Sequence, residues 1–396
     1  MLGTKTVNGK AAGEGLWMWL HRWSGLVIMA FIALAALTGC VLVLGVPIDH
    51  AVNAAMFRTP ESSVPRLAPL AAVEKFQRDN PNIAVTNFPL EVDPGMALVL
   101  TVAPQPGGAW VGYDQLFLDP ATGKVLGTRK MSGGGGIQKS LMTKISHLHK
   151  NLLLGNFGRV VMGVAALVWL LTNFIGIWLT VPRRAPRWRQ WLRMWKMRAS
   201  SPFARQMLDL HRASGLWLLL PLTLLAFTSV AFNFEREIYL PALEKLSPPH
   251  NNFLHKPVPF LLGTRPTIGF GDALRFAEAE AVNQKLEGRP ASMMYDPGNN
   301  HYAIAFTPDG KVSTRGLGPV SLYVDAVKGR FLYRDDPYHD SFGVVMERMI
   351  YPVHSGRVLG WPGQALVFVL GLVTFAQTAT GLYVWWKKRR TRLAGS

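Results

Sequence analysis

Four long apolar stretches constrain this chain more than any other feature. They cover residues 23–46, 160–181, 213–232 and 363–386. Each is long enough to supply the ~20 helical residues that cross a hydrocarbon core. The sequence therefore predicts an integral membrane α-helical protein with four main transmembrane helices and both termini on one side. The first stretch is longer than the apolar part of a secretory signal, and no cleavage pattern follows it, so we expect an uncleaved anchor.

Basic residues gather in three segments beside these stretches. The segment up to Arg22, the linker 183–212 and the tail after Trp386 hold three, nine and five Lys or Arg residues, which supply most of the net charge of +18. Lys and Arg accumulate in loops that stay in the cytoplasm, so the termini and the linker are predicted to be cytoplasmic. The near-neutral segments 47–148 and 235–360 are predicted to be periplasmic. We assign the basic excess to topology and contact with membrane lipid, and we expect no nucleic-acid binding.

The chain also contains an internal duplication. Residues 20–26 (LHRWSGL) recur as residues 210–216 (LHRASGL), with six of seven positions identical. The second and fourth apolar stretches match at a shift of 205, which aligns His149, Gly155, Gly158 and Gly176 with His354, Gly360, Gly363 and Gly381. Fixed-shift similarity of this kind indicates repeated structural units. We predict two copies of a unit made of a helix, a periplasmic segment and a second helix.

Each periplasmic segment is predicted to form a small α+β module. Residues 116–126 and 322–332 each place apolar runs on both sides of an Asp-to-Gly turn, which is typical of a hairpin. Residues 70–77 and 273–281 are amphipathic and precede these hairpins, so we expect them to be helical. The prediction is one such module in each copy.

Four histidines occupy matched positions in the two copies. His21 and His211 begin the first and third stretches, whereas His149 and His354 precede the second and fourth. A crossing helix separates the two membrane faces by ~30 Å, so only histidines from opposite copies share a depth. The sequence therefore predicts two pairs, His21 with His211 and His149 with His354. A lone histidine at a membrane interface is commonly structural, but its duplication favours a functional role.

The residues beside these histidines suit a porphyrin better than a bare metal ion. Gly25 and Gly215 lie one helical turn after their histidines and leave room for a flat ring. Arg22 and Arg212 are candidates to pair with propionates. Zinc usually takes further protein ligands, whereas axial histidine ligation is typical of haem. We therefore predict His21, His211, His149 and His354 as axial ligands of haem iron.

Other residues are assigned simpler roles. His50 is a rival ligand that ranks below His149, and His147 has none because it lies on another helix face. We expect His250, His255, His301 and His339 at the periplasmic surface, Pro221 to kink its helix, and Cys40 to be a small apolar residue that excludes a disulfide or a Cys-ligated metal. Polar residues within the spans are expected to hold helices together: Thr38, Thr172, Asn173, Thr228, Gln377, Thr378 and Thr380. No nucleotide-binding loop or serine-hydrolase motif is present.

Residues 20–26, the run from His354 to Gly360, and residues 380–389 (TGLYVWWKKR) resemble the PepSY-associated transmembrane helix family. That family includes iron-regulated inner-membrane proteins of Gram-negative bacteria and ferric-siderophore reductases of the ferrioxamine-reductase kind. The resemblance implies a location in the bacterial inner membrane, periplasmic PepSY-like modules and one or two haem b groups. It further implies an oxidoreductase that passes electrons to ferric siderophore in the periplasm and releases ferrous iron. Ala213 in place of Trp23 departs from the family motif, and the Ser-Gly-Arg after His354 has no counterpart after His149.

The electron donor and two other functions stay open at this point. The donor is either a membrane quinol or a separate cytoplasmic partner, and a homodimer is compatible with the sequence. One alternative is a non-enzymatic siderophore or peptide receptor or permease, and another is a haem quinol oxidoreductase with a different acceptor. The predicted organisation follows the chain: 1–46 N-terminus and helix 1, 47–148 module 1, 149–182 histidine segment and helix 2, 183–208 basic linker, 209–233 helix 3, 234–353 module 2, and 354–396 histidine segment, helix 4 and basic tail.

Overall fold

The computed structural model describes residues 5–59, 68–105, 107–131, 140–182, 185–250 and 265–394. His255, Arg183 and Arg184, on which some of the predictions fall, lie outside these ranges. The chain divides into two compact units. A helix bundle comprises Met1–Leu44, Ile145–Ala242 and Ile350–Ser396, and a sheet domain comprises Gly45–Lys144 and Leu243–Met349.

Three helices of the bundle are long and apolar enough to cross a membrane. They lie within α1 (Lys5–Val43), α6 (Gly155–Thr180) and α13 (Trp361–Ala394), and their apolar spans are Gly15–Val43, Gly155–Thr180 and Trp361–Thr391. Three of the four predicted spans are thereby confirmed.

The predicted third span is a pair of helices rather than one. Helices α8 (Phe203–Trp217) and α9 (Leu219–Asn233) meet at Leu218 with a bend of 74°. Pro221 accounts for the break, because it has no N–H to bond the Trp217 carbonyl and its ring crowds that turn. The kink expected from the sequence is confirmed.

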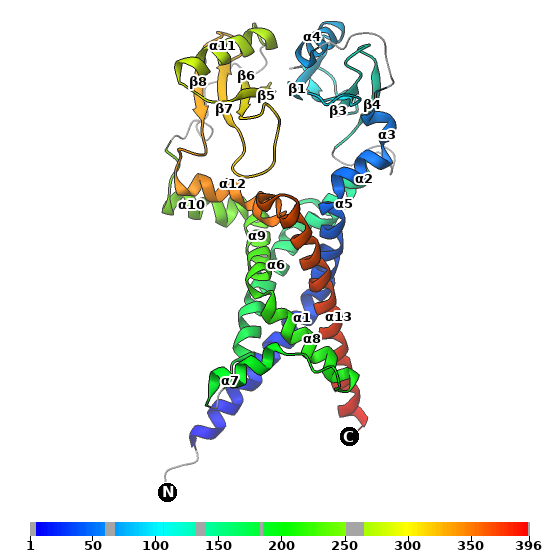
Figure 1. Cartoon of the computed structure of the whole chain (residues 1–396), viewed down its shortest axis with the longest axis vertical. Coiled ribbons are helices and arrows are strands. Elements are labelled where there is room, and N and C mark those ends of the chain that lie inside the picture. The colour runs from blue at the N-terminus through cyan, green and yellow to red at the C-terminus, as the bar shows by residue number, and fades with distance from the viewer. Residues whose placement is uncertain are drawn as a thin grey trace. The chain divides into compact units, whose positions relative to one another are not determined.

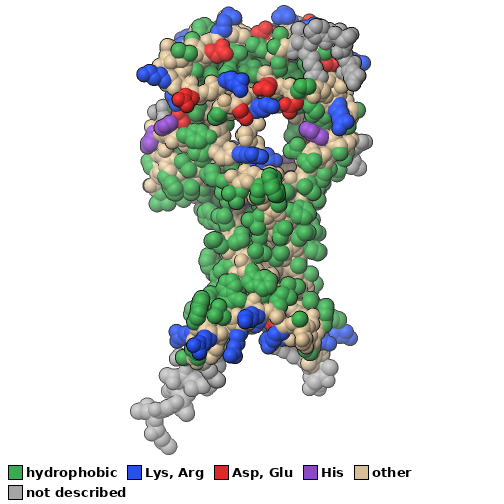
Figure 2. Space-filling model, viewed as in Figure 1, with side chains coloured by type: hydrophobic (Ala, Val, Ile, Leu, Met, Phe, Trp, Pro, Cys, Tyr) green, Lys and Arg blue, Asp and Glu red, His purple; other side chains and the backbone are tan. Residues whose placement is uncertain are grey.

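The long helices form a closed ring of neighbours. α1 contacts α6 and α13, α6 contacts α9, and α8 contacts α13 (Figure 1). Large apolar side chains cover the outside of this bundle (Figure 2), and Leu220, Phe157 and Val27 are 80%, 71% and 69% exposed. So much exposed apolar surface indicates contact with lipid rather than with water.

The remaining helices within the described ranges are short. They are α2 (Gly45–Val52), α3 (Ala54–Phe57), α4 (Pro69–Asp79), α5 (Leu141–Asn151), α7 (Arg187–Leu192), η1 (Arg193–Trp195), the π-helix η2 (Glu235–Tyr239), α10 (Leu240–Leu246), α11 (Phe270–Asn283), α12 (Phe342–His354) and η4 (Arg357–Leu359). The basic linker carries α7 and η1. Trp191 anchors it by donating its indole N–H to the Thr180 hydroxyl.

The sheet domain contains one antiparallel sheet of eight strands. The strands are β1 (Ile83–Pro89), β2 (Leu98–Pro104), β3 (Gln115–Leu118), β4 (Val125–Arg129), β5 (Arg289–Asp296), β6 (His301–Thr307), β7 (Val320–Asp325) and β8 (Phe331–Asp335). Their order is β4-β3-β2-β1-β5-β6-β7-β8. The predicted hairpins are confirmed as β3–β4 and β7–β8, and the predicted helices as α4 and α11.

The two sets of four strands join at their first strands. β1 pairs with β5, and Phe88 lies opposite Met293. These two residues are separated by the same shift of 205 that relates the second and fourth apolar stretches. The two predicted modules therefore share a continuous sheet in which like strand meets like strand.

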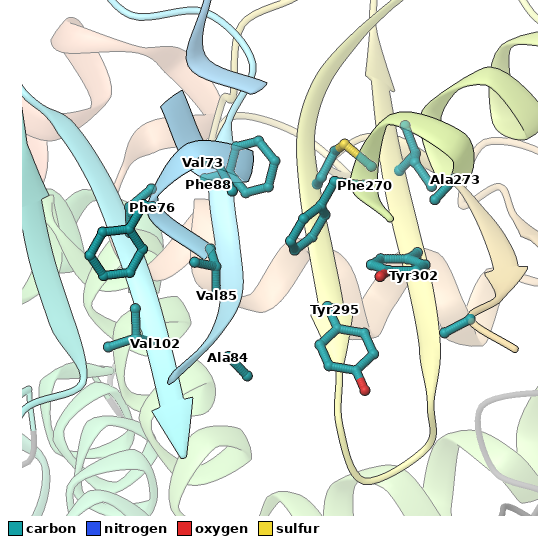
Figure 3. Close-up of a cluster of buried hydrophobic side chains, with 14 of the residues drawn as sticks. Val73, Phe76, Ala84, Val85, Phe88, Val102, Phe270, Ala273, Tyr295 and Tyr302 are labelled. Atoms are coloured by element: carbon teal, nitrogen blue, oxygen red, sulfur yellow. The ribbon is translucent and has the colours of Figure 1, made fainter. Parts of the chain in front are cut away.

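A single apolar core runs under both halves of this sheet. Val73 and Phe76 from α4 and Phe270 and Ala273 from α11 belong to one buried cluster with the central strands (Figure 3). Phe88 meets Phe270 edge to face with ring centres 5.1 Å apart. Each copy thus covers part of the other's core.

His301 corrects an expectation from the sequence, which placed it at the surface. It is only 4% exposed in β6, and its ring packs against Tyr323. Alternation along the strand puts Tyr302 and Ile304 on the core face and His301 with Ala303 on the opposite face, which a second cluster with Tyr323 and Tyr333 also buries.

Gly371 provides a test of close packing between α1 and α13. A Cβ at this position would lie 2.5 Å from Cys40 Sγ and 3.1 Å from the Ala36 carbonyl oxygen. We predict that Gly371→Ala destabilises the bundle by about 1–3 kcal/mol, a typical cost of overpacking. The measurement is thermal unfolding in detergent, with Gly15→Ala as control because a Cβ at Gly15 meets nothing within 4 Å. Adding Cys40→Ala should recover part of the loss, and equal melting temperatures for Gly371→Ala and wild type would contradict this packing.

His301 gives the sheet domain an acid-sensitive group. Burial lowers the pKa of His301, and the charge of Asp296 opposes this only in part. The unfolded chain, with a histidine pKa of about 6.5, therefore binds a proton more readily than the folded chain, and stability falls as pH drops below that value. We predict that His301→Asn reduces the loss of thermal stability between pH 7.5 and 5.5. The exposed His339→Asn serves as control, and an unchanged loss in His301→Asn would refute the assignment.

Candidate functional site

The structure places the four repeat-matched histidines in two pairs within the bundle. The first pair joins His21 of α1 to His211 of α8, with ring centres 6.3 Å apart and ring planes at 75°. The second pair joins His149 of α5 to His354 of α12, with ring centres 6.3 Å apart and ring planes at 65°. Each pair takes one histidine from each copy, as the sequence analysis predicted.

The spacing within both pairs suits a metal ion held between two imidazoles. Each metal–nitrogen bond would be about 2 Å long, and a ring nitrogen lies about 1 Å from the centre of its own ring, given C–N bonds of ~1.33 Å. Two imidazoles on opposite sides of one ion therefore have ring centres about 6 Å apart. The separation of 6.3 Å is repeated at both pairs. An incidental contact between aromatic rings would not be expected to recur with the same distance at both pairs.

The second pair is oriented by hydrogen bonds at Nδ1. His149 Nδ1 lies 3.0 Å from both the Thr38 hydroxyl and the Ala35 carbonyl of α1. His354 Nδ1 lies 2.9 Å from the Thr228 hydroxyl of α9. The hydroxyls of both threonines donate to carbonyls of their own helices, which leaves them as acceptors for the imidazole N–H. Each ring therefore keeps Nε2 for a ligand.

One histidine of the first pair is held in the same way. His211 Nδ1 lies 3.0 Å from the Gln377 carbonyl and 3.3 Å from the Thr380 hydroxyl, both on α13. His21 differs, because its buried Nδ1 has no hydrogen-bond partner among the described residues. The Thr172 backbone lies near its ring without reaching hydrogen-bond geometry.

Glycines let three of these rings lie against the neighbouring helix. A Cβ added at Gly39, Gly381 or Gly176 would lie 3.3, 3.3 or 3.4 Å from Cε1 of His149, His211 or His21. A side chain larger than a methyl group would displace the ring. Each histidine is thus positioned by the other main helix of its own copy and faces a histidine of the other copy.

A cavity of about 370 Å³ lies beside the first pair, within the size range of small-molecule sites. His21, His211, Gly25 and Gly215 line it, together with Arg22. The lining is largely apolar. A Cβ at Gly25 would meet nothing within 4 Å, so this position leaves the space open that the sequence analysis expected.

The two arginines predicted to bind propionates have different surroundings. Both line the cavity, but the buried Nε of Arg22 has no hydrogen-bond partner among the described residues. Arg212 donates to the fully buried Asp209 at 2.9 Å and to the Met194 carbonyl at 3.0 Å. Asp209 also accepts ion pairs from Arg198 and Arg205. Arg22 is therefore available for a cavity anion, whereas Arg212 is already paired, and a propionate role for either stays a prediction.

The donor set of each pair fits a cofactor that brings its own equatorial ligands. Within the ranges that the structure describes, no group of three or more His, Cys, Asp or Glu side chains is arranged to hold a metal ion. Two neutral imidazoles on opposite sides match axial ligation of a haem. The residues present therefore fit haem on spacing, orientation and, at the first pair, an open cavity.

Sequence reasoning missed the threonines that orient the histidines. Thr38, Thr228 and Thr380 were expected only to hold helices together. The available signal was a Thr-Gly or Thr-Ser dipeptide that recurs at 38–39, 228–229 and 380–381. His50, the rival ligand, packs on Phe57 in the sheet domain with ring centres 4.1 Å apart and joins neither pair.

The sequence pattern of the PepSY-associated TM region family matches residues 18–388. The chain therefore belongs to this family of membrane proteins. The match covers both histidine pairs, most of the length of the apolar helices and the sheet domain. The comparison with curated proteins gives no match.

Proposed function

We propose that this chain is a haem-containing reductase of the bacterial inner membrane that passes electrons to ferric siderophore in the periplasm. The observation that carries the proposal is the repeated cross-copy histidine pair, with one ring separation at both sites. Family membership supports the membrane location and the PepSY-type modules.

In this proposal each pair holds one haem b. Haem bound between two histidines supplies a one-electron carrier. His21 and His211 offer Nε2 at the first pair, and His149 and His354 offer it at the second. Arg22 pairs with a propionate in the cavity, because its buried Nε otherwise lacks a partner.

The proposed topology follows from the charges and the chain order. Lys and Arg gather at the end of the bundle where α7 lies (Figure 2), which is the pattern of a cytoplasmic side. The bent pair α8 and α9 then crosses the membrane as the third of four spans in chain order, which puts both termini in the cytoplasm. His21 and His211 belong to the cytoplasmic half. His149 and His354 follow the segments of the sheet domain in the chain and belong to the periplasmic half.

The chemistry needs one electron for each ferric ion. Hard oxygen ligands hold Fe(III) more tightly than Fe(II), because their attraction falls with the charge of the ion. Transfer of one electron therefore reduces Fe(III) to Fe(II) and weakens its complex with the siderophore. A membrane quinol would supply two electrons and release two protons, and so serve two ferric siderophores. A separate cytoplasmic protein is the alternative donor.

We predict that protein purified with ample haem supply shows a Soret band that sharpens on reduction with dithionite. Alanine in place of His21, His211, His149 or His354 removes one axial ligand and should lower the haem content of that site. His147→Ala is the matched control, because His147 lies on α5 two residues from His149 and outside both pairs. Reduced protein should then be reoxidised by ferrioxamine in stopped flow.

The alternative outcomes separate the competing functions. A colourless protein whose histidine variants behave like wild type refutes the reductase. Binding of siderophore by such a protein would favour a receptor or permease, for which the 74° break between α8 and α9 is the one supporting feature. Haem that dithionite reduces but ferric siderophore does not reoxidise would indicate a different acceptor.

A further inference from the structure

Three of the four histidines share one pattern of hydrogen bonds at Nδ1. A threonine hydroxyl contacts Nδ1, and at two sites the carbonyl three residues earlier contacts it as well. Thr38 and Ala35 hold His149, and Thr380 and Gln377 hold His211. Thr228, which matches Thr38 at the shift of 190, holds His354. The Thr38 and Thr228 sites are related by the duplication, and the Thr380 site at the other pair uses the same kind of contact.

The fourth site, at His21, lacks the threonine, because another residue stands at the matching position. Thr380 of the second copy corresponds to Ile175 of the first at the shift of 205. Gly176 still lies against the His21 ring, as Gly381 lies against that of His211. The helix approach is therefore preserved while the hydroxyl is missing. His21 Nδ1 is buried without a hydrogen-bond partner among the described residues.

We infer that this substitution makes the two pairs unequal, so that the second pair holds its cofactor at a lower reduction potential than the first. The inference rests on the proposed function. Thr38, Thr228 and Thr380 are positioning residues that act through the histidines, and Ile175 sets the difference between the pairs.

The physical reason lies in the basicity of the ligand. An Nδ1–H that donates to an oxygen makes the imidazole a stronger donor through Nε2. A stronger donor favours ferric over ferrous iron and so lowers the potential. For one electron, each tenfold preference for the ferric form corresponds to about 59 mV. Both ligands of the second pair have this support. In the first pair His211 has it, whereas the Thr172 backbone, which matches Gln377, lies near the His21 ring without reaching hydrogen-bond geometry.

The inequality suits transport of electrons outward. The siderophore stabilises Fe(III) and so has a low reduction potential itself. A low reduction potential at the periplasmic pair is therefore needed to reduce it. The higher potential at the cytoplasmic pair lets a mild donor such as a quinol reduce it. The step between the pairs is then unfavourable by potential alone, and the membrane potential, negative inside, drives the electron outward across it.

Potentiometric titration of the haem-loaded protein, followed by absorption, tests this inference without an activity assay. We predict two midpoints in the wild type. Ile175→Thr should shift the higher midpoint to a more negative value and leave the lower one in place. Thr228→Val should shift only the lower midpoint to a more positive value. Thr380→Val should shift only the higher midpoint, also to a more positive value.

Thr378→Val is the matched control. Thr378 lies on α13 beside the same cavity, but its hydroxyl donates to the Phe375 carbonyl and contacts no histidine. Both midpoints should stay unchanged in this variant. Two coincident midpoints in the wild type, or midpoints that do not respond to Ile175→Thr and Thr228→Val, overturn the inference and leave the proposed function standing. Protein that binds no haem overturns both.

Discussion

The bundle depends on a hydrogen bond between a histidine Nδ1 and an oxygen on the neighbouring helix. Thr38, Thr228 and Thr380 supply this oxygen as a hydroxyl, and Ala35 and Gln377 supply it as a carbonyl. A histidine among apolar helices needs such a partner, because an unsatisfied polar group there is costly. The bond also fixes which nitrogen carries the proton. At His149, His211 and His354 it thereby leaves Nε2 as the ring nitrogen without the proton and ties the two helices of one copy together, whereas His21 has no such bond among the described residues.

The duplication then decides what each ring faces. Contacts between equivalent positions of two copies are the mark of two-fold symmetry. Such contacts occur in both units of this protein: His21 meets His211 and His149 meets His354 in the bundle, while β1 meets β5 in the sheet. The repeat in the sequence thus accounts for both the paired histidines and the continuous sheet. It also explains why the paired histidines number four, and why Ile175 stands out at the position that matches Thr380.

Much of this arrangement could be predicted from the sequence, and the remainder has physical causes. The pairing of the histidines followed from the shifts of 190 and 205 together with the length of a membrane helix. The joining of β1 to β5 could not be predicted, because a strand's alternation does not reveal its partner. Likewise, the apolar pattern of 213–232 gives its length but not the sharp break at Leu218. Arg212 was expected to pair with a propionate, yet Asp209, three residues earlier on the same helix face, pairs with it.

The central claim is that each cross-copy histidine pair holds a planar cofactor. The most direct test is an experimental density map of the full-length protein purified from haem-replete cells. We predict a flat density between His21 and His211 and another between His149 and His354, which the Nε2 atoms of the two histidines would hold. Histidine pairs in direct contact with no density between them, in protein saturated with haem, would contradict it.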